Sequence, residues 1–120
     1  MTQLSYRHSK LWFAGQAQNW ELAAYELDEI KEGLADISQY HPNHHEVKGI
    51  PGQIERHMTA PINQTAQAIQ SKNPQTFTVG YDSITSGCNT CHQANGFGFN
   101  VIVTPQTNTY SNQQFNLRNR

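Results

Sequence analysis

The most regular feature of this chain is a stripe of apolar positions whose spacing alternates between three and four residues. Its members are Trp20, Ala23, Leu27, Ile30, Leu34, Ile37 and His41. An α-helix with 3.6 residues per turn brings such positions onto one face. The opposite face carries Glu21, Asp28, Glu29, Lys31, Glu32 and Asp36, as expected for a solvated surface. Asn19 is a favourable N-cap and Pro42 stops the pattern, so we predict an amphipathic helix between them.

Two other segments of the first seventy residues show the same period. Their marker residues are Leu4, His8, Leu11, Trp12 and Gly15 in one, and Ile54, Met58, Ile62, Ala66 and Ile69 in the other. The stretch from Pro42 to Gly52 is expected to be a connection. Pro61 interrupts the later segment, so either that helix kinks there or a short turn precedes a helix that begins near Ala60.

A last helix is expected to begin at Asn73-Pro74, because proline suits the first helical position. Its marker residues are Phe77, Tyr81, Ile84, Cys88 and Cys91, and its weak points are Gly80 and Gly87. Four helices with short connections predict an all-α protein, an up-down-up-down four-helix bundle. We divide the chain into a helical domain, 1–96, and an extended tail, 97–120, which packs on the bundle or is partly disordered.

Two cysteines and a histidine lie together at the end of the last expected helix, in the segment Cys88-Asn89-Thr90-Cys91-His92. This spacing matches the motif that attaches a c-type haem. Cysteines three residues apart can each form a thioether with one vinyl group of the same porphyrin. The adjacent histidine then binds the iron as an axial ligand. We therefore expect one covalent haem c, held by Cys88 and Cys91, with His92 as an iron ligand.

Two other uses of a close cysteine pair compete with haem attachment. A thioredoxin-like redox pair lies at a strand-to-helix turn of a βαβ unit, whereas the residues before Cys88 have the helical period. A zinc site needs two further ligands, and no second ligand pair lies at finger-like spacing. The candidates for such ligands are His8, His41, His44, His45 and His57.

Charge and hydropathy exclude several partners. The net charge of −1 gives no electrostatic reason to expect nucleic acid or an acidic membrane surface. No apolar run is long enough for a membrane span. The first ten residues are polar and lack the apolar region of an export signal. Because covalent haem attachment generally occurs outside the bacterial cytoplasm, we expect a mature periplasmic form whose signal was removed.

With this motif the chain resembles the cytochrome c′ and cytochrome c-556 family, which are four-helix-bundle c-type cytochromes. The likeness rests on Cys88–His92 and on Tyr6-Arg7-His8-Ser9-Lys10-Leu11. The latter is similar to a Tyr-Arg-x-Ser-x-Leu/Met stretch in the first helix of the family. The resemblance covers roughly Leu4 to Ala94, and the long tail after Gly96 departs from the family. It implies that Leu11 takes the distal haem position, where the family carries a non-coordinating Leu or a coordinating Met.

Other residues compete for the sixth position of the iron. His8 lies one helical turn before Leu11, so it is either a second axial ligand opposite His92 or a hydrogen-bond donor to a haem propionate or a backbone carbonyl. Met58 is a further candidate ligand. Arg7 is either a partner of a propionate, because a guanidinium suits a carboxylate, or an exposed arginine.

The expected bundle also predicts which residues cover the haem. The motif end of the last helix is level with the start of the first, the end of the second and the start of the third. The residues there are Leu4, His8, Leu11, Trp12, Leu34, Ile37, Tyr40, Ile54, His57 and Met58.

Two functions follow from the two kinds of distal face. A six-coordinate iron favours one-electron transfer, with redox partner proteins. An open, Leu-capped face favours binding of a diatomic gas, as cytochromes c′ bind nitric oxide and carbon monoxide. No carboxylate pair, serine triad or phosphate loop points to an enzyme, and peroxidase chemistry is the least favoured reading. Family members are often dimers through their first two helices, which makes a homodimer one expectation.

Overall fold

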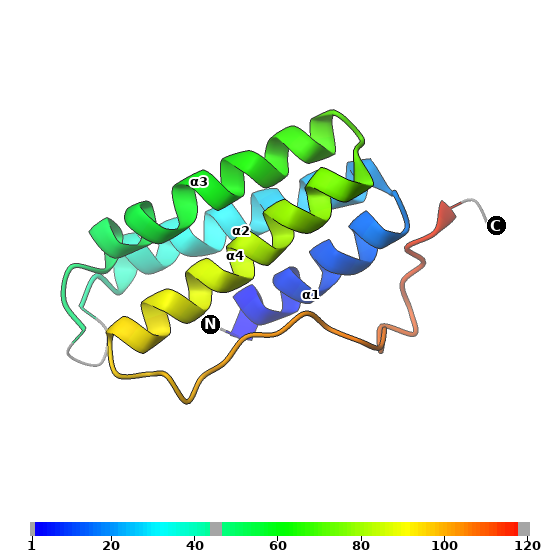
Figure 1. Ribbon diagram of the computed structural model, residues 1–120. Helices are drawn as coiled ribbons and strands as arrows, with labels where there is room; N and C mark the ends of the chain where they lie inside the picture. Colours follow the sequence, from blue (N-terminus) through cyan, green and yellow to red (C-terminus); the bar gives the residue numbers. More distant parts are fainter. Residues whose placement is uncertain (1, 44–46, 118–120) are drawn as a thin grey trace.

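The computed structural model of the protein describes residues 2–43 and 47–117. Within these ranges the chain forms four helices and no strand: α1 (Thr2–Gln16), α2 (Trp20–Tyr40), α3 (Ile50–Gln70) and α4 (Pro74–Ala94). Consecutive helices run in opposite directions along one long axis (Figure 1). The prediction of an all-α four-helix bundle is confirmed for the described residues. None of the described helices is long and apolar enough to cross a membrane.

Two of the turns between helices are built in the same way. The side chains of Asn19 and Asn73 accept hydrogen bonds from backbone N–H groups in the first turns of α2 and α4, respectively. The residue before each cap, Gln18 or Lys72, has a φ of 55°, in the left-handed region. Because a left-handed residue ends one helix directly before the cap of the next, the chain reverses within a few residues.

Helix α3 begins at Ile50, inside the stretch expected to be a connection. It continues through Pro61 as one helix, as the first of the two alternatives has it. The alternative of a helix that begins near Ala60 is therefore wrong. Pro61 has no N–H to donate to the carbonyl of His57, four residues earlier. That carbonyl faces α4, at Gly87.

The two glycines that weaken α4 lie at close contacts with α3. A Cβ atom on Gly80 would lie 2.5 Å from Thr65 Oγ1, and one on Gly87 would lie 2.6 Å from the His57 carbonyl oxygen and 2.8 Å from Met58 Sδ. The close packing of α3 on α4 therefore requires glycine at these two positions, in spite of its poor helix propensity.

The core lies along the middle of the bundle and is rich in aromatic rings. Tyr81, Phe77, Leu11 and Ile84 are its largest fully buried apolar side chains. Trp12 packs against Tyr81, with ring centroids 4.9 Å apart. These residues belong to α1 and α4, so the core ties together the first and last helices of the chain.

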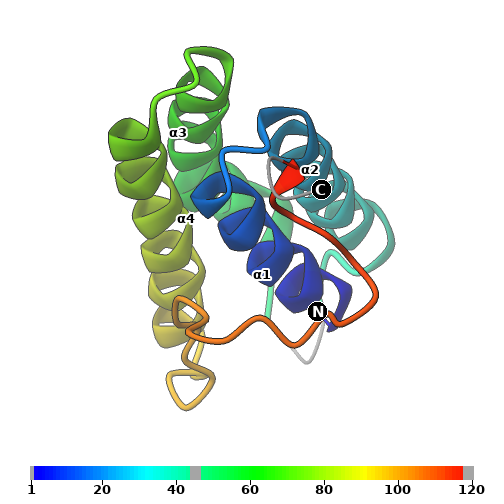
Figure 2. The same ribbon diagram turned by 90° about the vertical axis from the view of Figure 1, so that its right-hand side faces the viewer.

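Residues 95–116 form neither a helix nor a strand, and this segment runs back along α1 (Figures 1 and 2). Near its end Phe115 is buried, at 6% exposed, and packs on Phe13 with ring centroids 5.7 Å apart. Its carbonyl oxygen accepts a hydrogen bond from the Asn19 side chain at 3.1 Å. Phe99, by contrast, is 81% exposed. Residues 118–120 lie outside the described part of the tail.

Candidate functional site

The motif residues lie in the last turns of α4, at the end of the bundle where α2 ends and α3 begins (Figure 1). Cys88 and Cys91 are both free of disulfide bonds and partly buried. Cys88 packs against the hydrophobic core, which places its sulfur toward the bundle interior. Two thiols on adjacent turns at the rim of an apolar core are the donor set that covalent haem attachment requires.

The ring of His92 has a fixed orientation. Its Nδ1 lies 2.8 Å from the backbone carbonyl oxygen of Asn100. A carbonyl oxygen only accepts, so Nδ1 carries the proton and donates it. In the neutral ring the lone pair is then on Nε2, which is the nitrogen left to bind a metal. The Asn100 carbonyl comes from the tail, outside the helical bundle.

Burial dominates the chemistry of the two thiols. It raises the pKa of Cys88 to about 11, and the neighbouring Cys91 adds to the rise. The pKa of Cys91 is also raised by burial, against a hydrogen bond from Asn95 that lowers it. Redox-active cysteine pairs have lowered pKa values in electropositive surroundings. The thiols here are neutral, which does not favour the thioredoxin-like alternative.

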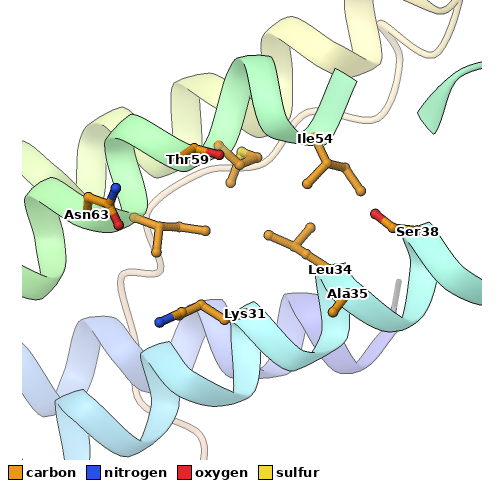
Figure 3. Close-up of a pocket in the computed structure, with 9 residues that line it drawn as sticks. Lys31, Leu34, Ala35, Ser38, Ile54, Thr59 and Asn63 are labelled. Carbon is orange, nitrogen blue, oxygen red and sulfur yellow. The ribbon is translucent and has the colours of Figure 1, made fainter. Parts of the chain in front are cut away.

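An elongated cavity lies between α2 and α3 near the motif end of the bundle, with a volume of about 230 Å³. Leu34 and Ile54 reach into it from opposite sides (Figure 3). Its other lining residues are Lys31, Ala35, Ser38, Met58, Thr59, Ile62 and Asn63. Met58 also lies against Gly87, the residue before Cys88, so it joins this cavity to the motif. Three of the residues expected to cover the haem therefore meet here: Leu34, Ile54 and Met58.

This cavity is smaller than the roughly 300–1,000 Å³ of most ligand sites. Cys88, Cys91 and His92 are the donors that a c-type haem needs. The space between α2 and α3, however, is too small for a porphyrin. Accommodating one needs α2 and α3 to move apart or the side chains between them to rearrange.

His8 lies in a buried hydrogen-bond network and is 7% exposed. Its Nε2 lies 2.8 Å from Thr85 Oγ1 and its Nδ1 lies 3.0 Å from the Tyr81 hydroxyl. Burial lowers the pKa of His8 to about 4, so the ring is neutral. A neutral imidazole is the form that binds iron, but both nitrogens already have partners on α4. Coordination by His8 would require at least the contact with Thr85 to break.

Arg7 and Leu11 occupy different environments on α1. The Arg7 guanidinium faces α2, where Nη1 lies 3.1 Å from Glu26 Oε1 and Nη2 lies 3.7 Å from Glu29 Oε2. A bond from Arg7 to a propionate would compete with these carboxylates. Leu11 is fully buried in the core. Cys88, Cys91 and His92 are adjacent on α4, whereas Arg7 belongs to the interface of α1 with α2.

Several residues that contact the candidate site carry no signal of this role in the sequence. Asn89 and Asn100 stand at positions where the haem motif and an extended tail accept any residue, so the sequence does not predict their contacts. The helical spacing predicts Tyr81 only as a core residue, and it does not distinguish Thr85. The spacing of Tyr81, Thr85 and Cys88 along one face of α4 was the available sign that they lie in line.

The other histidines do not complete a zinc site in the part of the chain that the structure describes. There, no three His, Cys, Asp or Glu side chains are grouped so as to hold a metal ion. His57 lies beside an outer groove between α3 and α4, and His41 is exposed after α2. His44 and His45 lie outside the described residues. Comparison of the chain with models of known families, with curated proteins and with solved structures finds no match.

Proposed function

We propose that this chain is a c-type cytochrome that carries one haem, bound through Cys88 and Cys91, and transfers single electrons. The orientation of His92 supports this proposal most directly. Its Nδ1–H is held by the Asn100 carbonyl, which leaves the lone pair on Nε2, and neither cysteine of the motif is in a disulfide. A haem bound there would supply an iron that changes between the ferric and ferrous states.

Each motif residue has a distinct role in this proposal. The Cys88 and Cys91 thiols would hold the haem as thioethers, each by addition of S–H across one vinyl group, which consumes no oxidant. His92 Nε2 would be the protein ligand of its iron. Leu34, Ile54 and Met58 supply apolar surface that excludes water from the porphyrin.

A cytochrome c′-like function is the second candidate, and the network of His8 favours it. If Thr85 and Tyr81 keep both His8 nitrogens, no histidine faces the iron from α1, and Leu11 leaves an open distal face. Such a face would bind nitric oxide or carbon monoxide. We propose redox partner proteins for the first function and a diatomic gas for the second, both in the periplasm.

The test is production of the chain in a bacterial periplasm that attaches c-type haem, followed by denaturing electrophoresis with haem staining. We expect haem to remain on the denatured polypeptide, and replacement of both Cys88 and Cys91 by Ser to abolish the stain. Thr90→Ala, between the cysteines, is the matched control and should retain the stain. A chain without covalent haem under these conditions would overturn the proposal.

The optical spectrum of the isolated holoprotein then separates the two functions. A low-spin spectrum in both oxidation states supports a sixth protein ligand and electron transfer. A high-spin spectrum with rapid binding of carbon monoxide supports the open distal face.

A further inference from the structure

The side chain of Asn89, inside the motif, makes two hydrogen bonds to one residue of the tail. Asn89 Nδ2 donates a hydrogen bond to the Ile102 carbonyl oxygen at 2.8 Å, and the Ile102 N–H donates to Asn89 Oδ1 at 2.7 Å. A single amide therefore holds both backbone groups of one tail residue. Both bonds are partly buried, so neither group exchanges easily with water.

The same short stretch of tail supplies the carbonyl that holds His92. Asn89 and His92 are three residues apart on α4, and therefore neighbours on its surface. Asn100 and Ile102 face them from the tail. A turn closed by a bond from Asn100 N–H to the Phe97 carbonyl at 2.9 Å brings the chain back toward α4.

We propose that Asn89 is a positioning residue for His92: by holding Ile102, it keeps the Asn100 carbonyl at the Nδ1–H of the ring. This inference rests on the proposed function, because His92 is taken as the iron ligand. The carbonyl fixes the proton on Nδ1, which leaves the lone pair on Nε2. It also makes the imidazole a stronger donor, which stabilises ferric over ferrous iron.

The Asn100 carbonyl lies in a part of the tail where a side chain is needed to hold it in place. The acceptor is a backbone carbonyl in a segment with no helix or strand to hold it, and Phe99 beside it is largely exposed. The Phe97 N–H donates to the His92 carbonyl oxygen at 2.7 Å and ties this stretch to α4 before Asn100, and the two bonds of Asn89 tie it two residues after Asn100.

The test compares Asn89→Ala with Thr90→Ala, the exposed neighbour within the same motif. In the holoprotein we expect Asn89→Ala to make the Ile102 amide exchange about tenfold faster, as loss of about one net hydrogen bond implies. The haem midpoint potential should move to a more positive value, and the exchange of the His92 Nδ1 proton should accelerate. Thr90→Ala should leave all three unchanged.

Asn89→Asp provides a second variant should Asn89→Ala fail to fold. It keeps the acceptor for the Ile102 N–H and loses the donor to the carbonyl, so intermediate changes support the proposal. A midpoint potential and a His92 proton lifetime that do not change in the folded variant overturn it, even if Ile102 exchanges faster.

Failure of the proposed function gives a different result. If the isolated protein carries no haem, nitrogen-15 spectra of the His92 ring still report on Asn89. A ring protonated at Nδ1 that becomes a mixture of tautomers in Asn89→Ala supports positioning, and identical spectra overturn it.

Discussion

The Tyr81 hydroxyl lies 3.0 Å from Nδ1 of His8 and 2.9 Å from its backbone carbonyl oxygen, while the two rings stack with centroids 4.6 Å apart. Thr85 Oγ1 holds the other nitrogen and lies 3.1 Å from the Tyr81 carbonyl oxygen. With the proton on Nε2, His8 donates to Thr85 and accepts from Tyr81. With the proton on Nδ1, it donates to Tyr81 and accepts from Thr85. Either tautomer satisfies both ring nitrogens, because one of the two hydroxyls then donates its proton to the ring and not to a backbone carbonyl.

From this network we expect His8→Ala to leave the visible spectrum of the haem unchanged. The substitution should still lower the free energy of unfolding by about 1–3 kcal/mol, because the buried Tyr81 and Thr85 hydroxyls lose partners. Absorption spectra of the ferric and ferrous protein, with urea unfolding, measure both effects. A change from a low-spin to a high-spin spectrum would instead show that His8 coordinates the iron, as the sequence suggested.

The lowered pKa of His8 predicts how stability depends on pH. Burial moves its pKa from 6.5 to about 4, so between these values the unfolded chain binds a proton that the folded chain does not. Stability therefore rises with pH: the contribution is complete above 6.5 and is lost as the pH falls toward 4. A shift of this size corresponds to about 3 kcal/mol. Urea unfolding across this range should show a shallower pH dependence in His8→Gln, and an equal slope would refute the assignment.

The parts of the fold that follow from local pattern could be predicted from the sequence. The spacing from Trp20 to Ile37 and the caps at Asn19 and Asn73 specify where helices lie, because helix period and capping are local properties. The course of α3 through Pro61 could not be read in this way. A proline costs one hydrogen bond, and packing against α4 at Gly87 decides whether the helix continues.

The sequence likewise predicts one part of the candidate site and not the other. Cys88, Cys91 and His92 lie within five consecutive residues, so the motif can be recognised from the sequence alone. The partners of His8 lie on α4, far away in the chain, and the contact of Asn89 with Ile102 joins a helix to an irregular segment. Neither has a periodicity or a spacing that a sequence can display.

The close approach of α3 and α4 predicts that Gly87→Ala destabilises the protein. A Cβ atom there would meet the backbone carbonyl oxygen of His57 at 2.6 Å, and backbone atoms cannot move aside as a flexible side chain can. We expect a loss of about 1–3 kcal/mol in the free energy of unfolding. Gly52→Ala is the matched control, because a Cβ at that exposed position of α3 meets nothing within 4 Å. It should raise stability by about 0.5–1 kcal/mol, and equal effects at the two sites would contradict this account of α4.

Removal of the Arg7 side chain should show how much its ion pair with the buried Glu26 contributes to the free energy of unfolding. The Glu26 carboxylate is 1% exposed, and each of its two oxygens accepts a hydrogen bond from Arg7. We expect Arg7→Met to lower the free energy of unfolding by about 2–3 kcal/mol, since it leaves a buried charge without its partner. Adding Glu26→Gln should recover part of the loss. Glu29→Gln, at the more exposed and longer contact of 3.7 Å, should cost less than about 1 kcal/mol.

The same variants decide between the two interpretations of Arg7. If the guanidinium only pairs with Glu26, the haem midpoint potential of Arg7→Met and of the double variant should equal that of the unsubstituted protein. If Arg7 binds a propionate, both variants should share a shifted potential that Glu26→Gln alone does not produce. Chemical denaturation and redox titration of the three proteins measure the two quantities independently. We expect a stability change without a change in potential, because the pairing of Arg7 with α2 already satisfies its charge.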